Sequence, residues 1–315
     1  MNKDQFQKWF CANGSKKCKA SSATTQYYNV KRLRRLLGHS DKIPKGHSWL
    51  PADPSKVFES PSPTVQRNLA TTAVSFMRRL SNVPEKKLNK YIDFMMKFSA
   101  KVDKIYQSGE KTAKQKKNWI SMKQVRQFAL EKYKMAADRG IWKKENWTPN
   151  ERQMAQAALV LALHSQSPPR LEMSSLVYTE TPDEEPQNEN FIYRKPRKGW
   201  FAMVGSGKTV RKEPFHIKLS KNASKILNRM RRHLRVGDPV FVTRKGTRMS
   251  RSAYGKWIIR MFKGRFDKHV TASMLRTIYI SEKYKDTAKW SEIVEDAGKM
   301  MHSAVTALSK YKKEL

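Results

Sequence analysis

Residues 148–170 read TPNERQMAQAALVLALHSQSPPR and predict a helix that is followed at once by an arginine. Thr148, Pro149 and Glu151 form the pattern of a capping box at the start of a helix. The body of the segment is apolar nearly all round, which is typical of a buried helix. We therefore expect this helix inside a domain, with Arg170 just beyond its end.

The chain before this segment predicts a helical unit. Residues 1–24 read as a loose basic tail, because NGSKK and SSATT are loop signals. Apolar residues recur at helical spacing in residues 64–80 and 85–106. The polar stretch SGEKTAKQKK then reads as a linker. We expect a basic tail over 1–24, a helical domain over 25–112 and a second domain over 113–315.

Short strands are predicted after Arg170. NFIYRK (190–195), GWFAMVG (199–205) and FHIKL (215–219) read as strands, and GSGKT (205–209) reads as a hairpin turn. Helical patterns with dense Lys and Arg resume from residue 220. The expected fold class is mostly α, an α+β fold with one small antiparallel sheet embedded in the second domain.

Charge is the dominant feature of the composition. Lys and Arg number 65 against 27 Asp and Glu, which gives a formal net charge of +38. Such a surface attracts polyanions over long range, so nucleic acid is the expected partner. A basic protein without a polyanionic partner is disfavoured, because so large an imbalance makes a compact fold repel itself.

The two cysteines, Cys11 and Cys18, are too few for a disulfide framework, so we expect free thiols and a reducing compartment. A zinc site with His39 and His47 is an alternative. Six residues separate the cysteines, more than the usual two to four, so the sequence favours ordinary thiols and no metal. The N-terminus lacks an apolar signal region, and no stretch approaches the length of a membrane span. We expect a soluble, intracellular protein that does not bind membranes.

Four short pieces of the second domain carry candidate catalytic residues. In chain order they are SPPRLEM (167–173), GSGKTVRK (205–212), MLRTIYISEKY (274–284) and HSAVTALSKY (302–311). Each piece alone is a weak signal, because a single basic residue in this chain is most often a solvated charge or a phosphate contact. Together, in this order, they resemble the catalytic domain of the tyrosine recombinases, the phage-type integrases. The integrases of large DNA viruses, virophages and virus-like mobile elements are the most similar, from about Asn118 to Tyr311.

The resemblance implies roles for individual residues. Arg170 and Arg276 correspond to the two arginines of the family, and Tyr311 corresponds to the nucleophile. Lys208 corresponds to the hairpin lysine, with Lys212 as second choice, and His302 to the position nine residues before the tyrosine. A second set is expected to assist or to contact double-stranded DNA: Ser273, which replaces the usual histidine and can bind a phosphate oxygen, Glu172 as an orienting or structural carboxylate, and Arg211, Lys212, Arg244, Lys245, Arg248 and Arg251.

Strand cleavage by a tyrosine explains why these residue types are needed. Two guanidinium groups can clamp the non-bridging oxygens of a phosphodiester as charge develops on them. A phenol with an ordinary pKa near 10 must lose its proton as it attacks, and a lysine can protonate the departing 5′-oxygen. The covalent 3′-phosphotyrosine conserves the bond energy, so no ATP and no cofactor are expected. The sequence contains no P-loop and no carboxylate cluster of a two-metal nuclease.

The spacing of His302 and Tyr311 predicts a break in the terminal helix. Nine residues at about 100° each turn a helix by about 900°, so the two side chains would lie on opposite sides of it. Both can reach one phosphate only if the helix ends or restarts, which we expect near Thr306–Ser309. A continuous helix over 300–313 would contradict the catalytic assignment.

Two other functions remain open at this point. A type IB topoisomerase shares the chemistry but relaxes supercoils as a monomer, and a non-catalytic DNA-binding protein could keep the fold without the reaction. Only KKEL follows Tyr311. If the chain is a recombinase, we expect a tetramer in synapsis and a monomer or dimer when free, with subunit contacts elsewhere in the chain. Viral origin would place it in the nucleus or cytoplasm of an infected cell, or in a virion.

Overall fold

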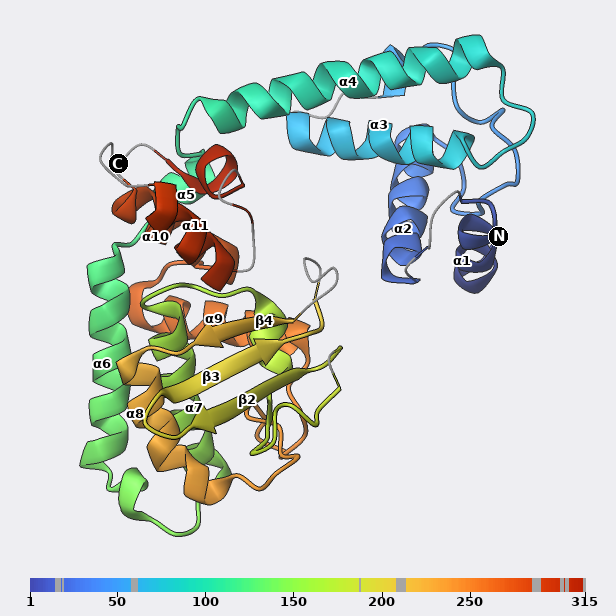
Figure 1. The fold of residues 1–315 in the computed structure, drawn as a ribbon. Coiled ribbons are helices and arrows are strands. Elements are labelled where there is room, and N and C mark those ends of the chain that lie inside the picture. Colours follow the sequence, from blue (N-terminus) through green and yellow to red (C-terminus); the bar gives the residue numbers. More distant parts are fainter. Residues whose placement is uncertain are drawn as a thin grey trace. The chain divides into compact units, whose positions relative to one another are not determined.

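The protein folds into two compact units, Met1–Ser108 and Gly109–Leu315 (Figure 1). The structure is a computed structural model that describes residues 1–14, 18, 20–57, 62–186, 188–207, 214–284, 290–300, 303 and 306–313. The boundary between the two units, after Ser108, falls a few residues before the expected one between 112 and 113. The fold is mostly helical, with a small sheet in the second unit. None of the helices within these ranges is both long and apolar enough to cross a membrane.

The first unit is built from helices that share one core. They are α1 (Lys3–Ala12), α2 (Ala20–Leu36), α3 (Pro63–Met77) and α4 (Glu85–Gln107), with a 3₁₀ turn η1 (Pro54–Val57). The expected loose tail over residues 1–24 is wrong. Asn2 and Gln5 form a capping box that begins α1, and the side chains of Phe6 and Phe10 are buried. Burial of two aromatic rings outweighs the local loop signals.

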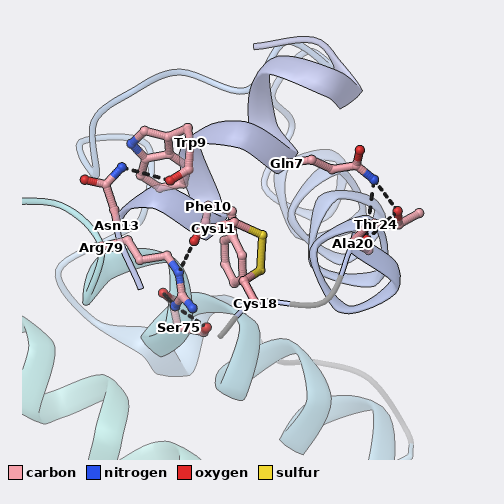
Figure 2. The surroundings of a disulfide bond; sticks show 10 residues. All are labelled: Gln7, Trp9, Phe10, Cys11, Asn13, Cys18, Ala20, Thr24, Ser75 and Arg79. Carbon is pink, nitrogen blue, oxygen red and sulfur yellow. Dashed lines mark hydrogen bonds between the residues drawn. A yellow bond between two sulfur atoms is a disulfide. The ribbon is translucent and has the colours of Figure 1, made fainter. Parts of the chain in front are cut away.

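A disulfide links Cys11 to Cys18 (Figure 2), so the expectation of free thiols is wrong. The chain turns back between α1 and α2, which pack against each other, and this brings the two sulfur atoms together. Arg79 supports the same region: its Nε donates to the Phe10 carbonyl at 2.9 Å, and its guanidinium carbon lies 3.6 Å from the centre of the Phe10 ring. The end of α1 is therefore fixed from both sides.

The alternative zinc site is not formed. The two sulfur atoms bond to each other, His39 Nε2 lies 3.2 Å from the Trp49 carbonyl, and His47 Nε2 lies 2.9 Å from the Asn82 carbonyl. Across the described ranges, no group of three or more His, Cys, Asp and Glu side chains could hold a metal ion.

The second unit places its long helices around a buried one. Its helices are α5 (Ala113–Asn118), α6 (Met122–Asp138), α7 (Pro149–His164), α8 (Lys221–Met230), α9 (Arg251–Phe266), α10 (Ala272–Lys283) and α11 (Trp290–Lys299), with short turns η2 (Ile141–Lys143), η3 (Leu171–Ser175) and η4 (Arg231–His233). The predicted capping box is confirmed, since Thr148 Oγ1 accepts from Glu151 N at 3.3 Å. Every residue of α7 from Ala155 to His164 is buried, as predicted.

The sheet has four strands in the order β1 (Val177–Tyr178), β2 (Asn190–Lys195), β3 (Gly199–Val204), β4 (Phe215–Lys218). β2, β3 and β4 are antiparallel neighbours, but β1 runs parallel to β2. The sheet is therefore mixed, and the expected antiparallel sheet is wrong at this edge. The reason is the connection after β1, which carries the chain back to the same end of the sheet before β2 begins.

Alternation along the strands gives the sheet two apolar faces. Ile192, Trp200, Ala202 and Ile217 belong to the main core with residues of α7 and α8. The opposite face carries a small separate cluster of Phe191, Tyr193 and Met203. In Figure 1 the three longer strands lie in front of α7 and α8. The sheet thereby covers α7, the helix that precedes Arg170.

Candidate active site

Arg170 lies at the start of η3, directly after the buried helix α7. The turn packs on α9, where a Cβ added to Gly255 would lie 3.3 Å from Leu171 Cδ1. Pro169, just before the arginine, presents its carbonyl oxygen to Arg276 Nη1 at 3.0 Å. The loop that carries the first arginine is therefore tied directly to the second arginine.

Arg276 is almost fully buried on α10. The helix begins at Thr271, whose hydroxyl accepts from Met274 N at 3.1 Å, and the arginine side chain is only 7 % exposed. Burial lowers the pKa of Arg276, although the adjacent Tyr311 acts against this. Arginine stays protonated in proteins even so. A buried positive charge thus lies next to the Pro169 carbonyl and the Tyr311 ring.

Tyr311 lies in a π-helical turn, η5 (Ala307–Tyr311). α11 ends at Lys299, Ser303 has no helical structure, and the Ser303 hydroxyl accepts from Thr306 N at 3.2 Å as a helix cap does. The predicted break in the terminal helix is confirmed, since Ser303 is not helical and helical structure resumes at Thr306, within the expected Thr306–Ser309. π-helical turns are rare in proteins, and those that occur are often at functional sites.

The side chains of α10 hold the backbone of the Tyr311 turn. Ser281 Oγ accepts from Lys313 N at 2.8 Å and lies 3.2 Å from the Tyr311 carbonyl oxygen. The Tyr311 ring centre lies 5.7 Å from the Arg276 guanidinium carbon. The tyrosine therefore meets the second arginine through its ring and the same helix through its backbone.

The environment of Tyr311 makes the loss of its phenolic proton easier than in a free tyrosine. Burial raises the pKa of Tyr311, but the positive charge of Arg276, hydrogen bonds from the side chains of Arg276 and Ser273, and the charge of Arg170 outweigh burial. The pKa therefore lies below its ordinary value of 10.0. A phenol that ionises more readily is a better nucleophile at neutral pH.

The structure brings four of the predicted site residues together: Arg170, Ser273, Arg276 and Tyr311. A second group of predicted residues lies outside the described part of the chain: Lys208, Arg211, Lys212 and His302. The remaining predicted DNA contacts are exposed on the loop before α9 and at its first residue, namely Arg244, Lys245, Arg248 and Arg251.

Glu172 connects the first-arginine loop to the β3–β4 hairpin. Its side chain is buried, with Oε1 3.3 Å from Arg251 Nη2. A Cβ added to Gly207 would lie 2.9 Å from Glu172 Cγ, so the hairpin approaches as closely as only glycine permits. These residues line a cavity of about 440 Å³ together with Asn190, Ser206 and Arg248. The start of the hairpin therefore packs against Glu172, which follows Arg170 in the same turn.

Two buried residues near the site were not found from the sequence. His164 ends α7 with no exposed surface, and neither ring nitrogen has a hydrogen-bond partner among the described residues. Burial, with a further contribution from the charge of Arg276, lowers the pKa of His164 to about 3, so the imidazole is neutral. A lone histidine in an apolar helix was the available signal. The second residue, Asp296, had none, because several acidic residues of α11 look alike in the sequence.

No known protein family matches the chain, and neither the curated proteins nor the solved structures include a significantly similar one. The chemistry of the site therefore rests on its own residues: two arginines, a hydroxyl and a partly buried tyrosine.

Proposed function

We propose that the protein is a site-specific DNA recombinase of the tyrosine recombinase type, an integrase. The observation that carries the proposal is the position of Tyr311 beside Arg276, with its pKa lowered by the positive charges around it. A lower pKa brings no advantage to a tyrosine that is used only for packing. It does make a tyrosine that attacks phosphorus a better nucleophile.

The reaction is a transesterification without net hydrolysis. The Tyr311 oxygen forms a bond to the scissile phosphorus while the bond to the 5′-oxygen breaks, and the phenolic proton passes to solvent. Arg170 and Arg276 bind the non-bridging oxygens, where two guanidinium groups stabilise the developing charge. The 5′-oxygen leaves with a proton, which the resemblance assigns to Lys208. A 5′-hydroxyl of another strand then reverses the step and releases Tyr311.

The charge of the chain supports DNA as the substrate. A net charge of +38 suits a polyanion, and the exposed basic residues before α9 lie on the same unit as Arg170 and Tyr311. The nucleophile and its activating arginine distinguish this proposal from that of a DNA-binding protein without activity.

A pool of nicked duplexes with randomised sequence tests the proposal, because a nick traps the covalent intermediate when the short cleaved strand diffuses away. On a denaturing gel, wild type should give a protein–DNA adduct that survives without metal or ATP. Tyr311→Phe should give none, whereas Tyr28→Phe, at a tyrosine exposed on the first unit, should behave as wild type. If none of the sequences in the pool gives an adduct, the proposed enzyme activity is refuted.

A second assay separates the recombinase from a topoisomerase. Once a reactive sequence is recovered from the pool, the protein is given two separate duplexes that contain it. Joining of the two duplexes supports a recombinase. Relaxation of a supercoiled plasmid with no joining would show a type IB topoisomerase instead.

A further inference from the structure

The polar residues at the end of α10 meet a single buried carboxylate. The Tyr279 and Tyr284 hydroxyls donate to Asp296 Oδ2 at 3.0 and 2.6 Å, and Lys283 Nζ also donates to it. Lys299 Nζ lies 3.7 Å from Oδ1 of the same carboxylate. Asp296 is on α11 and is only 4 % exposed. These contacts attach α11 to α10.

The charges of this group are consistent with a fixed attachment. A buried carboxylate is costly unless it is paired and hydrogen-bonded. Burial raises the pKa of Asp296, but hydrogen bonds from Lys283, Tyr284 and Tyr279 outweigh burial, so its pKa lies below the ordinary value. Burial raises the pKa of both tyrosines, and Asp296 adds to the effect, so they donate as neutral phenols.

The same helix also carries the second arginine and holds the nucleophile. Arg276, Tyr279 and Lys283 recur at intervals of three and four residues, which places them along one face of α10. Ser281 lies within hydrogen-bonding distance of the Tyr311 turn. α10 therefore carries Arg276 and holds both ends of the segment that leads to Tyr311: α11 through Asp296 and η5 through Ser281.

We propose that Tyr279, Lys283, Tyr284 and Asp296 form a clasp that positions Tyr311 against Arg276. The proposal rests on the function proposed above and gives a purpose to the polar residues of the segment MLRTIYISEKY. None of the four residues is proposed to touch DNA or the reacting atoms, so they are positioning residues. Release of α11 from α10 would displace the chain that leads into η5, and a displacement of about 1 Å at a reacting group can cost roughly 100-fold in rate.

The test compares Asp296→Asn with Glu295→Gln. Both changes neutralise one carboxylate of α11, but Glu295 is exposed and pairs only with Lys299 within the described ranges. Single-turnover formation of the covalent adduct should fall roughly 10- to 100-fold in Asp296→Asn and stay within about twofold of wild type in Glu295→Gln. DNA affinity should be unchanged in both. Equal adduct rates in the two variants would overturn the clasp.

A second readout separates positioning from mere stabilisation and needs no DNA. Absorbance titration of tyrosine ionisation, with the Tyr311→Phe curve subtracted, gives the pKa of Tyr311. In Asp296→Asn this pKa should rise towards 10, because Tyr311 moves away from Arg276. A lower melting temperature with an unchanged Tyr311 pKa would reduce the four residues to a structural role and overturn the proposal.

Two further outcomes keep this proposal separate from the proposed function. If wild type forms no adduct but Asp296→Asn raises the pKa of Tyr311, the clasp stands and the recombinase fails. If wild type forms the adduct and Asp296→Asn changes neither rate nor pKa, the clasp alone fails. Should Asp296→Asn not fold, Tyr284→Phe removes one donor with little change in volume. It should lower the adduct rate and raise the Tyr311 pKa as Asp296→Asn does, but to a smaller extent. If neither quantity changes, the clasp is overturned.

Discussion

The guanidinium carbon of Arg276 lies 5.7 Å from the centre of the Tyr311 ring within the same chain. The two residues come from α10 and η5, and the Ser281 hydroxyl of α10 accepts from Lys313 N just after η5. Under the proposed function, Tyr311 and Arg276 of one protomer would therefore act on the same phosphate. Several consequences of this relationship can be measured.

The first concerns which protomer supplies the tyrosine. Because Tyr311 contacts its own Arg276, we expect cleavage in cis. A mixture of Arg276→Ala and Tyr311→Phe proteins should then give no covalent adduct on nicked duplexes. Wild type mixed with Tyr311→Phe serves as the control and should give adduct from the wild-type share. Adduct from the mixture of the two variants would show that Tyr311 acts on a phosphate held by another protomer.

The second concerns pH. Burial raises the pKa of Tyr311, but Arg276, Ser273 and Arg170 together lower it by more, so the net pKa lies below 10.0. The rate of adduct formation should therefore rise with pH and level off below pH 10. Arg276→Gln should shift the start of the plateau to higher pH. It should also lower the rate by roughly 100-fold, the usual cost of losing a group that stabilises developing charge. A pH profile unchanged by Arg276→Gln would contradict the assignment.

The same shift has a consequence for stability. The folded state has the lower pKa, so ionisation of Tyr311 stabilises the fold. This contribution is complete above pH 10, is lost as the pH falls through the folded pKa, and is absent below it. Urea unfolding of wild type and Tyr311→Phe should therefore diverge as the pH rises towards 10. Parallel curves across that range would show that Tyr311 has an ordinary pKa.

The third concerns the contacts to DNA. Lys245 is exposed on the loop before α9 and is expected to bind a phosphate. Lys245→Gln should make the slope of log affinity against log salt concentration less steep by about 0.9. It should also weaken binding to all DNA sequences to the same extent. Lys245→Arg keeps the charge and should keep the slope. Fluorescence anisotropy over a salt series measures both, and an unchanged slope in Lys245→Gln would remove this residue from the interface.

The fourth concerns the disulfide of the first unit. Closure of a loop this short by Cys11 and Cys18 should contribute about 2.5 kcal/mol to the free energy of unfolding. The double variant Cys11→Ser and Cys18→Ser should lose this contribution, and a reductant should lower wild type to the same level without affecting the variant. Rapid alkylation of both cysteines in the native, unreduced protein would contradict the disulfide.

Local sequence signals predicted the parts of the fold that depend on nearby residues. The capping box at Thr148 and the strand Asn190–Lys195 were predicted where they occur, because both patterns are complete within a few residues. The helix Lys3–Ala12 was missed because loop signals flank it, while burial of Phe6 against distant helices decides its state. The parallel edge strand depends on a long connection, which has no local signature.

The candidate site shows the same division. Arg170, Arg276 and Tyr311 were proposed because their short motifs resemble those of the tyrosine recombinases, and the structure brings the three residues together. Asp296 was missed because its donors approach from another helix, and only the folded chain shows that three side chains of one segment meet it. His164 was passed over for the opposite reason, since it lies in a helix that is otherwise apolar and reads as core.

The identity of the residue joined to DNA decides whether Tyr311 is the nucleophile. Covalent complexes recovered from nicked duplexes can be digested with protease and nuclease, and the modified peptide sequenced by mass spectrometry. The account predicts a single modified residue, Tyr311, linked through a 3′-phosphate. A nucleotide on any other residue, or on Tyr311 through a 5′-phosphate, would contradict it.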